Sequence, residues 1–91
     1  MLKYFCHAQE RAFERYGIYL TMSQIRTLEK RIYNGDADYI GMGVNGTSMW
    51  SITYEQQTLY PLIDFEASII LTFLTKKMVN RNIKAKKYLA I

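Results

Sequence analysis

Three side chains able to bind or cleave a phosphate ester recur every four residues near the N-terminus. They are His7, Arg11 and Arg15, and His7 is the only histidine of the chain. On a helix, residues four apart share a face, so the spacing predicts an imidazole and two guanidinium groups in one row. A guanidinium matches phosphate geometry, and an imidazole exchanges a proton near neutral pH. The same row is equally consistent with a solvated helix face on which Glu14 offsets the charge of Arg11.

Residues 41–46, with the sequence GMGVNG, match the glycine spacing of dinucleotide-binding loops. In those loops the glycines end a strand and open a helix, whose N-terminus holds the pyrophosphate. Here the glycines stand between two segments with strand patterning, so we interpret them as bulge and turn residues. The pair Asn45-Gly46 predicts a type I′ hairpin turn, because both central positions of that turn require positive φ.

Residue types for metal or nucleophilic chemistry are scarce. One histidine, one cysteine and the acids Asp36 and Asp38 do not form a zinc-site pattern, so we expect neither a metal nor another cofactor. The two acids fit the end of a helix and a turn. Cys6, near the start of the first helix, is either a reactive thiol or, more commonly for a lone cysteine, a small buried hydrophobe. A single cysteine also excludes an internal disulfide.

The periodicity of the first 35 residues predicts two amphipathic helices. The first covers residues 6–17 and ends at Gly17, and residues 2–5 are either a short strand or its first turn. The second begins at a capping box formed by Thr21 and Gln24 and continues to about residue 34, before Gly35. The apolar stripe of the first helix is Phe5, Ala8, Ala12, Phe13 and Tyr16, and that of the second is Met22, Ile25, Leu28 and Ile32 with Tyr33 beside it.

After Gly35 the pattern changes to that of strands, expected at residues 38–44, 47–54, 59–65 and 68–75. Trp50, Ile52 and Tyr54 alternate with polar residues, which predicts that they share one face of the sheet. Pro61 favours an edge position for the third strand or an unpaired side of that strand at the proline, and the apolar fourth strand is expected at the centre. The prediction is therefore an α+β fold: two N-terminal helices packed on a four-stranded antiparallel sheet, followed by a basic C-terminal tail or helix.

The 91 residues form one domain, and the charge is distributed unevenly along it. Residues 1–75, the expected α+β domain, hold six Lys or Arg and eight Asp or Glu, a net charge of −2. Residues 76–91, a basic extension, contain six cations and no acid: Lys76, Lys77, Arg81, Lys84, Lys86 and Lys87. A basic end on a nearly neutral body favours an anionic partner, most simply nucleic acid. The alternative is a solvated and partly frayed terminus.

The chain shows no pattern of a signal peptide or a membrane span. Its most apolar run, residues 69–74, is far shorter than the roughly 20 residues that cross a bilayer. We therefore expect a cytoplasmic protein without a membrane partner.

The pattern His7-Ala8-x-x-Arg11-x-x-x-Arg15-x-Gly17-Ile18, followed by a second helix and the strand at residues 69–74, resembles the small RelE-like and colicin-type ribonuclease toxins of phages and plasmids. The resemblance covers roughly residues 5–75. Cys6 stands where that pattern has a serine, and the basic extension lies outside it. The resemblance implies that His7, Arg11, Arg15 and Thr72 line one site on the sheet.

The resemblance implies a metal-independent endoribonuclease without a cofactor. In that hypothesis His7 is the general base or acid, Arg11 and Arg15 hold the phosphate, and Thr72 is an orienting hydroxyl. The 2′-hydroxyl of RNA is the nucleophile, and the products are a 2′,3′-cyclic phosphate and a 5′-hydroxyl end. Lys76 and Lys77 then add backbone contacts.

The alternative is a small basic binding protein without catalysis, either a nucleic-acid binder or a phage-type inhibitor of a host protein. The partner is then RNA or another nucleic acid, or a host or antitoxin protein. Tyr54 and Tyr60 are candidates for stacking on bases, although most tyrosines in small domains belong to the core or its rim.

Overall fold

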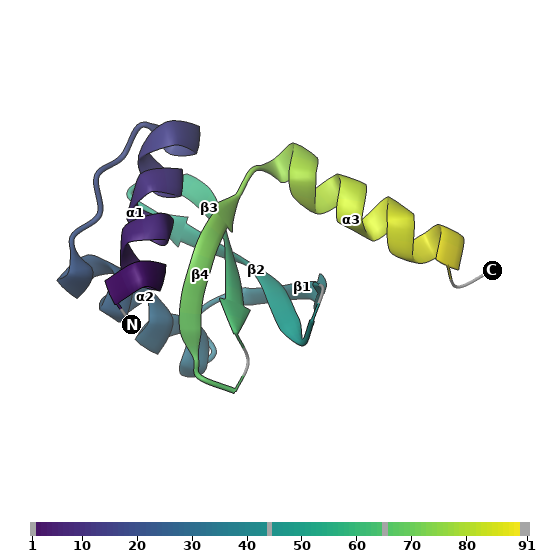
Figure 1. Ribbon diagram of the computed structural model, residues 1–91, viewed down its shortest axis with the longest axis horizontal. Coiled ribbons are helices and arrows are strands. Elements are labelled where there is room, and N and C mark those ends of the chain that lie inside the picture. The colour runs from purple at the N-terminus through teal and green to yellow at the C-terminus, as the bar shows by residue number, and fades with distance from the viewer. Residues whose placement is uncertain (1, 44, 65, 90–91) are drawn as a thin grey trace.

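The computed structural model describes residues 2–43, 45–64 and 66–89, with side chains from residue 5 to residue 83 within those ranges. Four strands form one antiparallel sheet in the order β1-β2-β3-β4, preceded by two helices and followed by a third (Figure 1). The elements are α1 (Leu2–Tyr16), α2 (Met22–Tyr33), β1 (Asp38–Met42), β2 (Thr47–Tyr54), β3 (Gln57–Asp64), β4 (Ile69–Leu74) and α3 (Lys76–Leu89). The predicted α+β fold is confirmed, and the described part of the basic C-terminal segment is a helix.

Local signals in the sequence place both N-terminal helices. Residues 2–5 form the first turn of α1, so the alternative of a strand there is wrong. Gly17 ends α1 with φ of 69°, and its N–H donates to the Phe13 carbonyl over 2.9 Å. The expected capping box opens α2: the Gln24 N–H donates to Thr21 Oγ1, and the Thr21 N–H donates to Gln24 Oε1.

Not every apolar residue of the two helices faces the core. Ala8 and Ala12 of α1 are fully buried, but Phe13 is 60% exposed, so its expected place in the apolar stripe is wrong. One residue beyond Ala12 turns a side chain by about 100° around the helix axis, away from the sheet. Met22 and Tyr33 are also exposed, Tyr33 to 80%, and they begin and end α2 where the packing stops.

The glycines of residues 41–46 act in a bulge and a turn, as expected. The β1–β2 register shifts between Tyr39 and Gly41, and Asn45 and Gly46 have φ values of 55° and 75°. Both residues thus have the positive φ that the sequence predicts. The Gly43 N–H donates to the Thr47 carbonyl over 2.8 Å, so the connection is longer than the two-residue type I′ turn that was expected. Val44 and Phe65, the expected last residues of the first and third strands, lie outside the described residues.

The positions of β3 and β4 in the sheet correct the sequence-based expectation. β3 lies between β2 and β4 although it carries Pro61, and the apolar β4 is an edge strand. The β2–β3 register passes from the pair Met49–Leu62 directly to the pair Ile52–Leu59. Pro61 lies in that interval, where its missing N–H removes a ladder hydrogen bond. An inner strand therefore tolerates the proline at the cost of a local gap in pairing.

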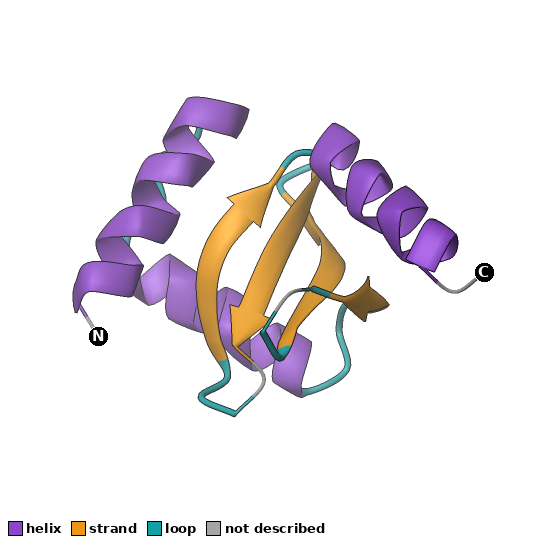
Figure 2. Cartoon of the chain, turned by 45° about the vertical axis from the view of Figure 1, so that its right-hand side comes forward, coloured by secondary structure: helices purple, strands orange, loops and turns teal. Residues whose placement is uncertain are grey.

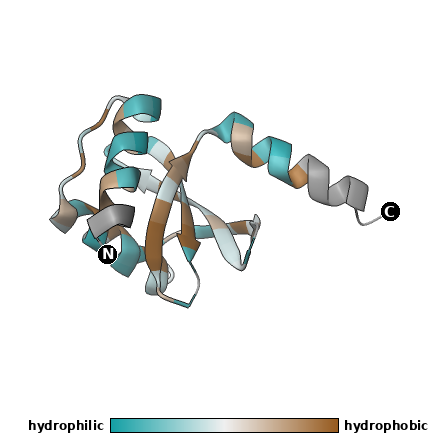
Figure 3. Cartoon of the chain, in the orientation of Figure 1, coloured by the Kyte–Doolittle hydropathy of each residue, from teal (hydrophilic) through white to brown (hydrophobic). Residues whose placement is uncertain are grey.

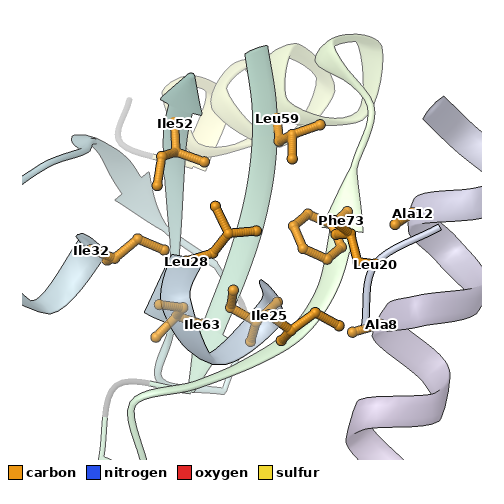
Figure 4. Packing of buried hydrophobic residues seen from close by; sticks show 11 residues of the cluster. Ala8, Ala12, Leu20, Ile25, Leu28, Ile32, Ile52, Leu59, Ile63 and Phe73 are labelled. Atoms are coloured by element: carbon orange, nitrogen blue, oxygen red, sulfur yellow. The ribbon is translucent and has the colours of Figure 1, made fainter. Parts of the chain in front are cut away.

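The sheet carries apolar side chains on both faces. α1 and α2 lie on one side of it and α3 on the other (Figures 1 and 2). The main cluster joins α1 and α2 to the sheet around Phe73 and contains Ile52 (Figure 4). Trp50 and Tyr54 pack against this cluster, so the three residues share one face of the sheet as predicted. A second, smaller cluster on the other face contains Met49, Leu74 and Val79, with Ile40, Tyr60, Leu62 and Met78 at its border. The structure thus has two unequal cores separated by the sheet.

Candidate functional site

The N-terminal row of His7, Arg11 and Arg15 forms on α1 as the spacing predicts. His7 is exposed. Arg11 Nη1 lies 2.7 Å from Glu14 Oε2, so the ion pair inferred from the sequence is present. Arg15 points toward the sheet, where its Nη1 donates to the Phe73 carbonyl over 2.9 Å. Both arginines therefore have protein partners and are partly buried, and of the three residues only His7 is exposed.

Thr72, the fourth residue of the expected site, does not join this row. It pairs with Leu62 across the β3–β4 ladder, and residues directly opposite in such a pair share a face of the sheet. Leu62 packs on the second cluster with α3, whereas α1 packs on the main cluster through Ala8 and Ala12. The sheet therefore separates Thr72 from His7, Arg11 and Arg15, which corrects the expected four-residue site.

A bulge in β4 is the physical reason for this correction. Ile70 pairs with Ile63 and Thr72 pairs with Leu62, so two steps along β4 match one step along β3. Simple alternation would put Thr72 on the face of Ile70, toward the helices. The extra residue, Leu71, reverses the alternation, so Phe73 instead faces the helices and Thr72 faces α3.

Side chains from α1 and α2 form hydrogen bonds to the backbone of β4. The Ile70 N–H donates to Glu29 Oε2 over 2.8 Å, and the hydroxyl of Tyr16 donates to the Leu74 carbonyl. The contacts of Glu29 and Arg15 occupy backbone groups that an edge strand would otherwise offer to another chain. Burial, and secondarily the nearby Tyr60, raises the pKa of the Tyr16 hydroxyl above its ordinary 10.0. Arg15 therefore has a structural role that its place in the row did not reveal.

The expected nucleic-acid-binding cations lie on α3. Lys76, Lys77 and Arg81 are exposed and form no ion pair with any side chain that the structure describes. The backbone at Lys84, Lys86 and Lys87 continues the helix, while these side chains lie outside the described set. Figure 3 shows that hydrophilic residues predominate along the described part of α3.

Few contacts attach α3 to the body. Its first turn is capped by Thr75, whose Oγ1 accepts from the Met78 N–H over 3.2 Å. Val79 is buried in the second cluster, and Asn82 Nδ2 lies 3.7 Å from Met49 Sδ. Beyond that point the helix extends away from the sheet, and the molecule measures 42 × 27 × 25 Å (Figure 1). The cations are thus carried on a projecting helix.

The candidate stacking tyrosines and the lone cysteine have ordinary positions in the fold. Tyr54 and Tyr60 are half-buried against the two clusters, which places them at the rim of the core. Cys6 is exposed within α1, so neither the helix N-terminus nor the interior holds it. In the described ranges, no group of three His, Cys, Asp or Glu side chains is placed to hold a metal ion.

No helix in the described part of the chain has the length and apolarity needed to cross a membrane. Comparison with family models, with curated proteins and with solved structures finds no match to this chain. Its function is therefore inferred from its own residues and their geometry.

Proposed function

We propose that this protein binds nucleic acid through α3, by contacts to the phosphate backbone and without catalysis. The observation that carries the proposal is a projecting helix with exposed Lys76, Lys77 and Arg81 on a body of net charge −2. Lysine and arginine that neutralise phosphates release condensed counterions, which gives affinity without base specificity. The positive electrostatic field of these cations is concentrated on α3, and such a field also orients the approach of a polyanion.

The ribonuclease hypothesis has less geometric support than binding. Its hydroxyl, Thr72, lies across the sheet from His7, and Arg11 and Arg15 already have partners in Glu14 and the Phe73 carbonyl. A phosphate would have to compete with both partners before the arginines could stabilise a transition state. Binding through α3 needs no such rearrangement.

The test measures binding of a labelled single-stranded RNA by fluorescence anisotropy over a series of salt concentrations. The variant replaces Lys76, Lys77 and Arg81 with alanine together. The slope of log K against log salt should decrease in magnitude by about 0.7 for each phosphate that is no longer neutralised, or about 2 in all. A charge-conserving control, Lys76→Arg, Lys77→Arg and Arg81→Lys, should keep the slope. Equal slopes for the wild type and the alanine variant would refute the proposal.

A cleavage assay on the same RNA separates binding from catalysis. The RNA is incubated with the protein in the presence of a chelator and then run on a denaturing gel, beside a His7→Ala variant. We expect intact RNA in both lanes. Cleavage by the wild type but not by the variant would instead establish the metal-independent ribonuclease. If the anisotropy measurement shows no RNA binding even at low salt, the result would favour the other alternative, an inhibitor whose partner is a protein.

A further inference from the structure

A cleft lies between α2 and the sheet, on the side away from α3. Its volume is about 320 Å³, which is at the lower end of the roughly 300–1,000 Å³ of small-molecule sites. Its lining combines apolar and aromatic side chains with three polar ones: Ile32, Tyr33, Trp50 and Ile63, with Glu29, Ser48 and Ser68. A few polar groups in a mostly apolar cleft are typical of a site that orients one ligand.

The aromatic walls of the cleft suit a planar ring. Trp50 Nε1 donates to Ser48 Oγ over 2.9 Å, and the Tyr39 ring packs edge-on against the indole with centroids 5.3 Å apart. These two contacts fix the plane of the indole before any ligand arrives. Tyr33, at the end of α2, is 80% exposed and so has a free ring face. Aromatic rings of this kind bind nucleobases by stacking.

The carboxylate of Glu29 gives the cleft a preference among bases. Its Oε2 accepts the Ile70 N–H over 2.8 Å, which holds the side chain in place. A carboxylate has about four acceptor positions, so capacity remains for a ligand. Guanine presents two adjacent donors, N1–H and N2–H, on its Watson–Crick edge. Adenine, cytosine and uracil place an acceptor beside each donor, which a carboxylate repels, so Glu29 favours guanine.

A second hollow adjoins the cleft and provides positive charge. It has a volume of about 240 Å³ and shares Glu29, Tyr33 and Ser68 with the cleft. Arg26, Lys30 and Asn34 complete its lining. Arg26 and Lys30 are not buried, and cations beside an aromatic cleft match the phosphate of a nucleotide.

We propose that this continuous groove binds a guanine nucleotide. The base lies against Tyr33 and Trp50 with its N–H edge on Glu29, and the phosphate lies at Arg26 and Lys30. The site is on the opposite face of the sheet from α3. It is therefore independent of the proposed phosphate-backbone binding, and either proposal can fail alone.

The only tryptophan of the chain lines the cleft, so its fluorescence reports on occupancy directly. GMP, AMP and guanosine are titrated against the wild-type protein with excitation at wavelengths where the bases do not absorb. We expect a saturable change with GMP, at least tenfold weaker binding of AMP, and weaker binding of guanosine, which lacks the phosphate. No saturable change with millimolar GMP, or equal affinities for GMP and AMP, would overturn the proposal.

Three variants test the assigned contacts. Glu29→Gln keeps an acceptor for the Ile70 N–H but removes the negative charge, and should weaken GMP binding about tenfold and abolish the preference over AMP. Tyr33→Ala should weaken GMP binding about fivefold or more, the lower end of base–aromatic stacking. Arg26→Ala should weaken GMP binding but leave guanosine binding unchanged.

Matched controls separate these effects from general damage to the fold. Tyr19→Ala removes another exposed tyrosine, outside the cleft, and Lys77→Ala removes a cation on the other side of the sheet. Both should bind GMP like the wild type. Urea unfolding identifies any variant that is not folded, and the Ile70 amide resonance of the wild type should shift on GMP addition. Folded variants with unchanged GMP affinity would refute the assignment.

The nucleotide could be free or part of a single-stranded chain. A pentanucleotide with one central guanine is compared with GMP, in the variant that lacks Lys76, Lys77 and Arg81 so that α3 does not contribute. Tighter binding of the pentanucleotide that depends on Glu29 identifies the chain as the source. Equal affinity identifies the free nucleotide. A pentanucleotide that binds independently of Glu29 contradicts the site.

Discussion

Tyr16 shows how one hydroxyl attaches α1 to the end of β4. It packs beside the main cluster, and its O–H donates to the Leu74 carbonyl. The neutral form donates this bond, and burial raises the pKa of the hydroxyl above 10.0. The contribution of Tyr16 to stability is therefore fully present below pH 10 and is lost as the pH rises through the folded-state pKa.

The substitution Tyr16→Phe should lower the free energy of unfolding by about 1 kcal/mol at pH 7, the typical net value of one hydrogen bond. Above pH 10 the wild type begins to lose this contribution and the variant has none to lose, so the difference should shrink. Urea unfolding at pH 7 and at two pH values above 10 measures this difference in the free energy of unfolding. Tyr19→Phe, at an exposed tyrosine, should match the wild type throughout. A constant difference across this range would contradict the assigned pKa direction.

The hydroxyl of Thr72 contrasts with the hydrogen-bonded hydroxyl of Tyr16. Its Oγ1 is buried and has no hydrogen-bond partner among the described residues. A buried hydroxyl without a partner costs free energy relative to an apolar group of similar shape.

Thr72→Val should leave stability unchanged or raise it by up to about 1 kcal/mol, because the unpaired hydroxyl is removed. Thermal and urea unfolding measure the change. Thr58→Val on the exposed part of β3 should stay within about 0.5 kcal/mol of the wild type. A decrease of more than 1 kcal/mol on Thr72→Val would mean that the hydroxyl has a partner in solution.

The β1–β2 and β2–β3 connections of the sheet differ in how well their residue types suit positive φ. The β1–β2 connection contains Asn45 and Gly46, which are residue types that positive φ favours. Glu55-Gln56 joins β2 and β3 with φ of 45° and 68°, and neither side chain favours that region. Positive φ costs an ordinary residue about 1–2 kcal/mol, so the second turn carries strain. The cross-strand pairing beside it, Tyr54–Gln57 and Thr53–Thr58, compensates for that strain.

Replacement of Glu55-Gln56 by Asn-Gly should therefore raise the free energy of unfolding by about 1 kcal/mol. The substitution Gly46→Ala tests the same effect in the opposite direction. An added Cβ meets nothing within 4 Å there, so only the preference of the residue for positive φ changes. That variant should be less stable by about 1 kcal/mol. Both are measured by urea unfolding. An unchanged midpoint for the Asn-Gly variant would show that the second turn is not strained.

The whole chain divides into a packed body and a charged helix that it carries. The main cluster connects α1, α2 and three strands, whereas α3 reaches the sheet through its first two turns, chiefly Val79. Regions with few buried apolar contacts open locally at low free-energy cost. A helix anchored in this way keeps its cations accessible while its first turns cover Met49 and Leu74.

Val79→Ala should weaken the docking of α3 by about 1.5 kcal/mol, since two buried methyl groups are removed. Trypsin cuts after lysine and arginine, so cleavage within α3 should become about tenfold faster while the body stays resistant. Ile83→Ala, at a partly exposed position one turn further on, should change the rate by less than about threefold. Equal rates for Val79→Ala and the wild type would show that other contacts hold α3.

Short-range patterns in the sequence determined most of the elements. The capping box of α2, the left-handed Gly17 and the Asn45-Gly46 turn each depend on residues within one turn of each other, so no distant contact was needed to specify them. Alternation likewise placed Trp50 and Ile52 on one face of β2, and the packing shows that this face lies toward the helices. The N-terminal row of His7, Arg11 and Arg15 followed from helical spacing alone.

Only the tertiary structure decided how these elements combine. The sequence could not show that α1 covers the edge of β4, which explains why an edge strand is so apolar, or that Arg15 serves that edge. It also could not show the bulge at Leu71, which depends on pairing with β3 and moves Thr72 to the other face. The groove of Glu29, Tyr33 and Trp50 likewise joins residues from α2 and β2, whose proximity arises from packing and leaves no local pattern in the chain.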